Sequence, residues 1–382
     1  MHKYTVIQIY KCQVNGSLMT LMIVNCHLVY RFLSINSKFN MLFILPSKIS
    51  IMIEYWGKIM ELRKVQMTRG GTFFITLPKE WAISNGISRG AIVASLITPD
   101  GKLIIDPKYH VEPAPRMTVV KPGSLLKREI ISKYLLGYDV ITVEAKDKIT
   151  PEYRDIVKQV SSRLIGLEII EENYSRIVMQ CLLEPSALSP EKILRREHLI
   201  ASGMCRDAVT ALMEGDAQLA RNVIARDNEV DRLYFLLVRV LRTIIQNPGL
   251  SDKLSIHPID CLDYRLTASL IEAIADQSSQ IAEYAIKFEN LKFADEILKE
   301  IRNLFKIIYE SYESAVSAFL SRNISLAESV RENRPVIEEL NRKIEFLANL
   351  LPVERVQDLI TVLSLLNRIY DNSVDISDLT NP

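Results

Sequence analysis

Apolar residues recur at helical spacing through the second half of the chain, from Ser189 to the end. Ser189-Pro190-Glu191 is a strong helix start, because it joins a capping serine to a proline at the first helical position. The pattern is broken at Glu214-Gly215-Asp216, Asn247-Pro248-Gly249, His257-Pro258, near Asn290, at Ser321–Asn323 and at Leu351-Pro352. These breaks predict about six long helices, arranged three plus three.

The second helix of each predicted set has the same frame of apolar and polar positions, seen at Leu219–Leu233 and again at Leu326–Leu340. The repetition predicts a duplicated three-helix unit, with its first copy in residues 186–289 and its second in residues 290–382. One apolar stripe supplies the core of the first copy. Its members are Val223, Val230, Leu237, Leu241 and Ile244.

Residues 58–110 show strand-like patterns and tight-turn signals instead. The predicted elements are strands Leu62–Thr68 and Thr72–Leu77, a helix Pro78–Asn85, and strands Ala91–Thr98 and Lys102–Ile105. Arg69-Gly70-Gly71 and Pro99-Asp100-Gly101 supply the two turns. A unit this small leaves apolar surface exposed, so we expect it to dimerise.

Residues 116–185 read as a separate α/β segment. The predicted order is strand Met117–Val120, helix Ser124–Gly137, strand Val140–Glu144, helix Thr150–Ile165, and strands Leu167–Ile170 and Arg176–Leu183. This order favours a ferredoxin-like connector with its helices on one face of the sheet. It contains no glycine-rich phosphate loop and no cluster of catalytic residue types, so we assign it no site.

Residues 1–57 differ from the rest of the sequence in their pattern of apolar residues. Their apolar runs, Leu18–Leu33 and Phe39–Ile53, are too short and too interrupted for a membrane span of about 20 residues. We predict that this leader lies outside the fold, as a mis-called start or a disordered segment, with translation beginning near Met60. A weakly membrane-associating extension is the alternative.

The overall charge of +1 gives no sign of nucleic-acid binding, but the charge is unevenly distributed. Residues 58–108 hold eight Lys and Arg against four Asp and Glu, whereas residues 186–382 hold 23 against 30. The sequence therefore joins a small basic module to a large acidic one. Five scattered cysteines with no Cys-x-x-Cys pair argue against a disulfide framework or a thiolate zinc site, and they fit a cytoplasmic protein.

Two pairs of carboxylates stand four residues apart within predicted helices: Asp227 with Asp231, and Glu272 with Asp276. Residues at this spacing face the same side of a helix, so each pair presents its oxygens together, to a metal or to water. The alternative is an ordinary solvated helix face, since the periodicity forces neither pair inward. Four facing acids repel one another unless a metal or basic partners offset their charge.

The basic module resembles the AbrB/SpoVT family. The resemblance rests on the run from Leu62 to Trp81, which includes Leu77-Pro78-Lys79-Glu80-Trp81, and on Gly86-Ile87-Ser88-Arg89-Gly90. It implies a swapped-hairpin, β-rich dimer that binds double-stranded DNA, with basic side chains neutralising phosphates. The implied DNA-binding residues are Arg63, Lys64, Arg69, Lys79 and Arg89. The alternative is a set of solvated charges on a module that only dimerises.

The helical half resembles PhoU, the phosphate-uptake regulator family, over residues 186–382. The resemblance rests on the duplicated frame and on the acidic spacings. It implies a pair of three-helix bundles whose acidic motifs gather metal ions in multinuclear iron-type clusters. The implied metal-binding residues of the first repeat are Asp227, Asp231, Glu272 and Asp276.

The second repeat departs from this acidic pattern. Arg334 stands at the position equivalent to Asp227. Asn367 likewise stands at the position equivalent to Glu272. The acids that remain there are Glu338, Asp371 and Asp375. Because a cation in place of an anion repels a metal, we expect one competent site for iron or another divalent metal, and a second that is weak or replaced by ion pairs.

No Glu-x-x-His tetrad, nucleophile elbow or Walker loop is present in the sequence, so we do not predict an enzyme. The sequence favours a multidomain α+β protein, dimeric or larger, that regulates phosphate uptake. It would join a DNA-binding head to a helical part that responds to a metal, to phosphate or to a partner. The alternative is an interaction protein that does not bind DNA and restrains a phosphate ABC transporter.

Overall fold

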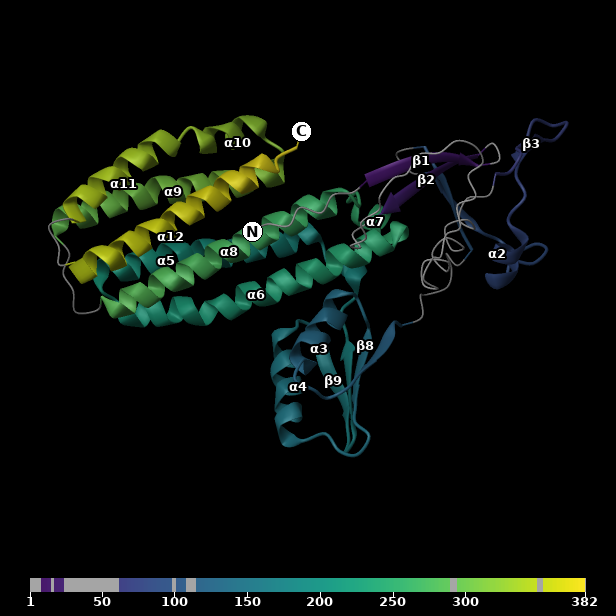
Figure 1. Ribbon diagram of the computed structural model, residues 1–382, viewed down its shortest axis with the longest axis horizontal. Coiled ribbons are helices and arrows are strands. Elements are labelled where there is room, and N and C mark those ends of the chain that lie inside the picture. Colours follow the sequence, from purple (N-terminus) through teal and green to yellow (C-terminus); the bar gives the residue numbers. More distant parts are fainter. Residues whose placement is uncertain are drawn as a thin grey trace, which may run out of the picture. The chain divides into compact units, whose positions relative to one another are not determined.

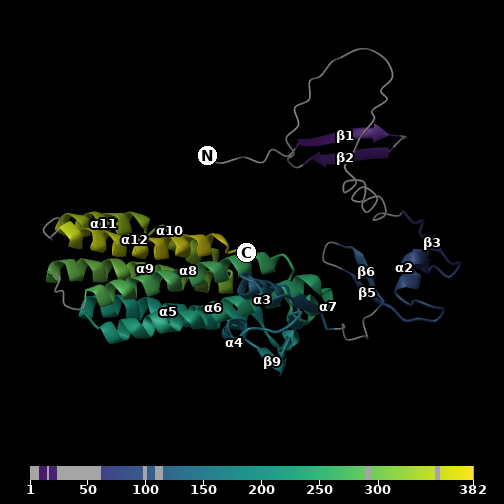
Figure 2. The same ribbon diagram turned by 60° about the horizontal axis from the view of Figure 1, so that its bottom comes forward.

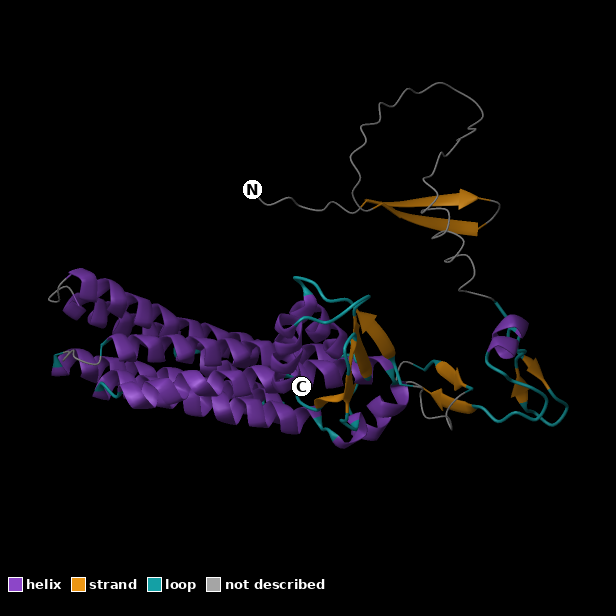
Figure 3. Cartoon of the chain, turned by 90° about the horizontal axis from the view of Figure 1, so that it is seen from below, coloured by secondary structure: helices purple, strands orange, loops and turns teal. Residues whose placement is uncertain are grey.

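The computed structural model describes residues 8–14, 17–23, 62–97, 101–107, 115–288, 294–348 and 353–381. The chain divides into two compact units, Met1–Val111 and Glu112–Pro382. Within the described residues, every helix is too short or too polar to cross a membrane. The mixed α+β class is confirmed, with small sheets in both units and a large helical bundle in the second (Figure 3).

The leader contains an antiparallel hairpin that the sequence analysis did not predict. Its strands are β1, Gln8–Val14, and β2, Ser17–Ile23, with Val14 opposite Ser17. The signal was present, because Asn15-Gly16 is the dipeptide most favourable to a tight hairpin turn. The prediction that residues 1–57 are a mis-called start or a disordered segment stays a prediction. Met60 and the proposed start of translation lie outside the described residues.

The basic module has the predicted order of elements. These are β3, Gln66–Met67; β4, Phe73–Phe74; α2, Lys79–Ser84; β5, Ala94–Ile97; and β6, Leu103–Asp106. β3 pairs with β4 and β5 pairs with β6, both antiparallel. Among the described side chains of residues 62–107 none is buried, and Phe73 and Ile92 are 71% and 74% exposed. One copy of this module therefore forms no closed hydrophobic core of its own.

The α/β domain has the predicted order of strands and helices. Its elements are β7, Met117–Val120; α3, Leu126–Leu135; β8, Val140–Glu144; α4, Pro151–Arg163; β9, Leu167–Glu172; and β10, Arg176–Cys181. Helices α3 and α4 lie on one side of the sheet (Figure 1). Ile130 and Tyr134 of α3 pack there with Ile141 of β8 and Met179 of β10, all fully buried.

The predicted ferredoxin-like arrangement is wrong in its strand order. The sheet runs β7-β8-β10-β9, with β7 and β8 parallel neighbours joined by α3. A ferredoxin-like sheet would instead place another strand between these two. β10 pairs antiparallel with both β8 and β9. Hydrophobic periodicity reports which residues form strands, but it carries no information on which strands become neighbours.

The bundle is formed by long helices in both repeats. Its first half contains α5, Pro190–Glu214; α6, Ala217–Gln246; the short α7, Pro248–Leu254; and α8, Asp260–Lys287. Its second half contains α9, Asp295–Ser321; α10, Ile324–Arg331; α11, Arg334–Ala348; and α12, Val353–Asp378. Helix α12 packs on both α8 and α9, so the two halves share one continuous core (Figure 2).

The two repeats differ at the shared frame. Leu219–Leu233 lies within the uninterrupted α6, whereas Leu326–Leu340 is divided between α10 and α11. Pro335 explains the break, because a proline has no amide hydrogen and its ring clashes with the carbonyl four residues earlier, at Arg331. Helix α10 ends at that residue. The prediction of one uninterrupted helix in the second repeat is therefore wrong.

Candidate functional site

Helix α6 begins at a well-formed cap and carries the first acidic pair. Gly215 adopts a positive φ of 71° and ends α5, which frees the chain to start the next helix. The Asp216 carboxylate then accepts hydrogen bonds from the amides of Gln218 (3.0 Å) and Leu219 (2.9 Å). This start sets the phase of α6, which places Asp227 and Asp231 beside its buried stripe, where both are half-buried.

The structure brings the two acidic pairs together across α6 and α8. Burial raises the pKa of Glu272 to about 7, and the charges of Asp276, Asp231 and Asp227 add to the effect. Burial, followed by the charges of Asp276 and Asp231, raises the pKa of Asp227 to about 6. Burial and the charge of Asp231 also raise the pKa of Asp276. We call these four residues the acidic cluster.

A basic residue of the α/β domain reaches this cluster. The Nη2 atom of Arg163, at the end of α4, donates a hydrogen bond of 2.6 Å to Oδ2 of Asp231. Its charge also lowers the pKa of Asp227, against the larger effects that raise it. Arg163 lies 68 residues before Asp231 in the sequence, so helical spacing could not associate the two.

A fifth carboxyl group lies in the bundle interior. Glu197 of α5 is fully buried, and neither of its carboxyl oxygens has a hydrogen-bond partner among the described residues. Burial raises its pKa well above the usual range, and the charge of Glu272 contributes to the same shift. The signal in the sequence was a glutamate within an apolar helix face, between Ile193 and Ala201.

The acidic cluster has ligands suited to a divalent metal, but they are not arranged around one ion. Carboxylate oxygens suit iron, manganese and other divalent metals. Among the described residues, no three His, Cys, Asp or Glu side chains are grouped so that they could hold a metal ion. Asp231 already accepts a hydrogen bond from Arg163. In this arrangement the cluster therefore does not fit a metal.

In the second repeat, one of the acids has a cationic partner. Arg334 Nη2 lies 2.9 Å from Oδ1 of Asp371, and its guanidinium group also lies over the Tyr370 ring. Burial, with the charges of Asp378 and Asp371, raises the pKa of Asp375. Asn341 donates a hydrogen bond of 2.7 Å to Asn367. Glu338 lies in α11, within electrostatic reach of Tyr370.

The basic residues of the first unit lie at separate turns and helix ends. Arg69 is in the turn between β3 and β4, Lys79 begins α2, and Arg89 is in the turn after α2. These three and Lys64 are exposed. Arg63 is half-buried, and its Nη1 atom donates a hydrogen bond of 3.1 Å to Thr76 Oγ1.

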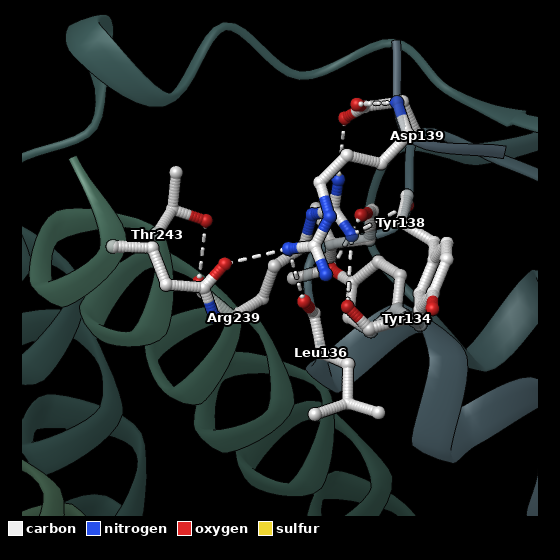
Figure 4. Close-up of polar contacts among 9 residues, drawn as sticks. Tyr134, Leu136, Tyr138, Asp139, Arg239 and Thr243 are labelled. Atoms are coloured by element: carbon white, nitrogen blue, oxygen red, sulfur yellow. Dashed lines mark hydrogen bonds and ion pairs between the residues drawn. The ribbon is translucent and has the colours of Figure 1, made fainter. Parts of the chain in front are cut away.

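A second arginine contact holds the α/β domain on α6. Arg239 is 4% exposed, and its Nη1 atom donates hydrogen bonds of 2.8 Å to the carbonyls of Tyr134 and Tyr138 (Figure 4). Its Nη2 atom lies 3.2 Å from Asp139 Oδ1. Near the end of α6, Arg116 also donates a hydrogen bond of 2.6 Å to Gln246. The α/β domain is thus attached to α6 around Arg239 and at the acidic cluster.

These features define a duplicated helical bundle with an acidic cluster in its first half and an α/β domain docked on α6. The bundle is similar to known proteins. The PhoU domain model matches residues 194–285 and 301–380. The PhoU domain model thus matches a segment in each half of the bundle, and residues 1–193 lie outside both matches.

Proteins of known name are similar to part of this chain. The chain is 28% identical over 165 residues to phosphate-specific transport system accessory protein PhoU homolog 1 of Thermotoga maritima, which covers 42% of this chain and 66% of that protein. It is 26% identical over 205 residues to the Pseudomonas aeruginosa PhoU homolog, covering 48% and 79%.

Two solved structures are also similar. The crystal structure of PhoU from Pseudomonas aeruginosa has a TM-score of 0.46 at 21% identity, covering 50% of this chain and 93% of that one. The phosphate transport system regulatory protein PhoU from Streptococcus pneumoniae has a TM-score of 0.45 at 15% identity, covering 50% and 91%.

Proposed function

We propose that this protein regulates phosphate uptake as an accessory protein of a phosphate transport system. The observation that carries the proposal is the pair of PhoU matches, which spans both helical repeats. The names of the relatives describe accessory proteins of such a system. A transporter subunit or a signalling protein is the partner that we propose for the bundle.

Phosphate uptake tests this proposal directly. In the organism that carries the chain, deletion of its gene is expected to leave uptake of radiolabelled phosphate high in phosphate-rich medium, where the parent strain restricts it. Restoring the gene should restore the restriction. Unchanged uptake in the deletion strain, at both high and low external phosphate, would contradict the proposal.

We propose that the acidic cluster binds iron or another divalent metal once its side chains rearrange. Mutual repulsion among Asp227, Asp231, Glu272 and Asp276 supports this, because a cation placed among them would relieve it. A bound metal would supply positive charge, and the protein's contribution is the set of carboxylates. Glu338, Asp371 and Asp375 form the weaker second site, where Arg334 already supplies a cation.

Elemental analysis tests the metal proposal. The purified protein is expected to contain more iron, manganese or zinc per chain than a variant with Asp227→Ala and Asp231→Ala. A variant with Asp371→Ala and Asp375→Ala provides the control from the second repeat, and it should lose much less metal. Equal metal content in the wild type and the first variant would reject the cluster as a metal site.

We propose that the first unit binds double-stranded DNA as a dimer. Its exposed basic residues and its resemblance to the AbrB/SpoVT family support DNA binding. Its exposed apolar side chains, such as Phe73 and Ile92, support association with a second copy, because burying them removes apolar surface from water. The swapped-hairpin arrangement of that dimer is part of the proposal.

DNA binding is measured by fluorescence anisotropy with duplex DNA at several salt concentrations. We expect affinity to fall steeply as salt rises, and the salt slope to decrease in a variant with Arg69→Ala and Lys79→Ala. The alternative is that the protein restrains a phosphate ABC transporter without contacting DNA. Co-purification of a transporter subunit, together with no DNA retention at low salt, would favour that alternative.

A further inference from the structure

A cavity lies where helices α5 and α6 meet the end of the α/β domain. Its volume is about 420 Å³, which is within the range of small-molecule sites, roughly 300–1,000 Å³. Ile165, between α4 and β9, lines it from the α/β domain, and Leu188 lines it from the segment before α5. No residue of the acidic cluster is among the described residues that line it. The cavity is therefore a separate place on α6.

The lining of this cavity is mainly aliphatic. Helices α5 and α6 contribute Ile193, Ile200, Leu233 and Leu236. Among the described residues that line the cavity none is aromatic, so a nucleotide base would find no ring on which to stack. A saturated chain placed against these side chains would instead leave water for an apolar surface. The lining thus favours a ligand with an aliphatic body.

Three cationic side chains accompany the aliphatic surface: Lys192 and Arg196 of α5, and Arg232 of α6. None of the three forms a salt bridge with a residue in the described part of the chain. Glu229, also in the lining, is exposed. Three positive charges and one negative charge leave the lining with a balance of +2. The cavity therefore favours an anion.

Arg232 is the most enclosed of these cations. It is half-buried, whereas Lys192 and Arg196 are exposed. Its Nε atom is buried and has no hydrogen-bond partner among the described residues. Arg232 also lines a second hollow of about 280 Å³, together with Lys158 and Ser162 of α4. A guanidinium group in this position retains donors for an anion, and charge-assisted hydrogen bonds are the stronger kind.

We infer that the cavity binds a small anion with an aliphatic body, whose carboxylate or phosphate group is held by Arg232 while its chain packs on the isoleucines and leucines. The start of α5 adds to the attraction, because Ser189 lies in the lining and the first turn of a helix is electropositive. This site goes beyond the proposed function and does not depend on it.

A ligand in this cavity would contact both parts of the second unit. Ile165 belongs to the α/β domain, whereas Leu233 and Arg232 belong to α6 of the bundle. A molecule that touches both parts in the docked arrangement stabilises that arrangement by binding it. The site therefore gives a small molecule influence over how the α/β domain is held.

Isothermal titration calorimetry of the full-length protein with decanoate, below the concentration at which decanoate forms micelles, tests the site. We expect decanoate to bind about tenfold more tightly than octanoate, because each buried methylene changes the affinity about fourfold. Uncharged 1-decanol should bind at least about tenfold more weakly than decanoate, since it lacks the anionic group. A comparison of decanoate with decyl phosphate identifies the preferred head group.

Four variants locate the bound chain. Arg232→Ala should weaken decanoate binding about tenfold, whereas Arg232→Lys keeps the charge, should retain most of the affinity and guards against a folding defect. Ala187→Trp adds bulk at an exposed position of the lining without removing a core side chain, and it should also weaken binding about tenfold. Arg221→Ala is the matched control, because Arg221 is an exposed cation of α6 outside the lining, and its loss should change the affinity less than about twofold.

The outcomes decide the inference without reference to phosphate uptake. Weaker binding by Arg232→Ala and Ala187→Trp, with Arg221→Ala unchanged, supports it. Equal decanoate affinity in all variants would place the chain elsewhere on the protein and would overturn it, as would the absence of decanoate binding to the wild type. Inorganic phosphate that binds as tightly as decyl phosphate would also overturn it, because the aliphatic body would then contribute nothing.

Discussion

Glu197 places an ionisable carboxyl group in an apolar environment. A carboxyl group that is fully buried and unpartnered among the described residues destabilises the folded state, because it gives up its contacts with water and gains none. Burial raises its pKa, so the folded protein holds the proton at a pH at which the unfolded chain releases it. Such groups are typical of sites where function, and not stability, decides the residue.

Replacing Glu197 by methionine is expected to stabilise the protein. Methionine keeps the unbranched shape and removes the unpartnered oxygens, so the free energy of unfolding should rise by about 1–3 kcal/mol near neutral pH. The wild type, whose Glu197 pKa is raised on folding, should lose stability as the pH rises above the unfolded pKa of about 4.3. The gain from the substitution should therefore shrink toward pH 4.

Chemical denaturation at pH 4 and at pH 7.5 measures this gain. Glu283→Met, at an exposed position of α8, controls for the added methionine and should leave stability unchanged at both pH values. A Glu197→Met protein that is less stable than the wild type at pH 7.5 would mean that the carboxyl group has a stabilising partner.

At the scale of elements, local signals decided how much the sequence could predict. Helix starts such as Ser189-Pro190 and turns such as Gly215 act on their immediate neighbours, so the long helices were predicted with their ends nearly correct. Pro335 was also a local signal, for a helix break. The prediction missed it because the frame of the second repeat was assumed to be one helix, as in the first repeat. The neighbours of β8, and the meeting of Arg163 with Asp231, depend on tertiary packing, which no periodicity encodes.

The turn from α4 into β9 depends on a glycine. Gly166 has a φ of +77°, and a Cβ atom there would lie 2.3 Å from the Cγ atom of Leu183. Gly166→Ala therefore combines an unfavourable backbone conformation with overpacking, and we expect it to lower the free energy of unfolding by about 2–4 kcal/mol. Gly123→Ala is the matched control, because no heavy atom lies within 4 Å of its added Cβ.

Thermal unfolding followed by circular dichroism compares the two glycine variants. The control should change the melting temperature by a few degrees at most, whereas Gly166→Ala should lower it clearly. Equal melting temperatures for both variants would show that Leu183 moves aside at little cost and that the turn tolerates a side chain.

At the scale of the whole second unit, the bundle and the α/β domain are joined by polar contacts on α6 and by apolar packing, such as that of Phe235 against the core of the α/β domain. Arg239 makes the most buried of these contacts, and Arg163 makes the one that involves the acidic cluster. A conformational change in the bundle can affect the α/β domain only through the residues at which the two parts are in contact. The Arg239 contacts share no residue with the acidic cluster, so they hold the domain on α6 independently of it.

Arg239→Ala is expected to detach the α/β domain from the bundle without unfolding either part. The substitution leaves the carbonyls of Tyr134 and Tyr138 without this donor, at a cost of about 1–3 kcal/mol. The lost ion pair with Asp139 adds little, because that carboxylate is 40% exposed and is screened by water. Limited proteolysis should then cut faster between β10 and α5, and unfolding should change from one transition to two.

Arg242→Ala is the control, because Arg242 is half-buried and its hydrogen bond to Leu135 is long, at 3.5 Å. If both variants unfold in a single transition with unchanged proteolysis, the docking does not depend on Arg239.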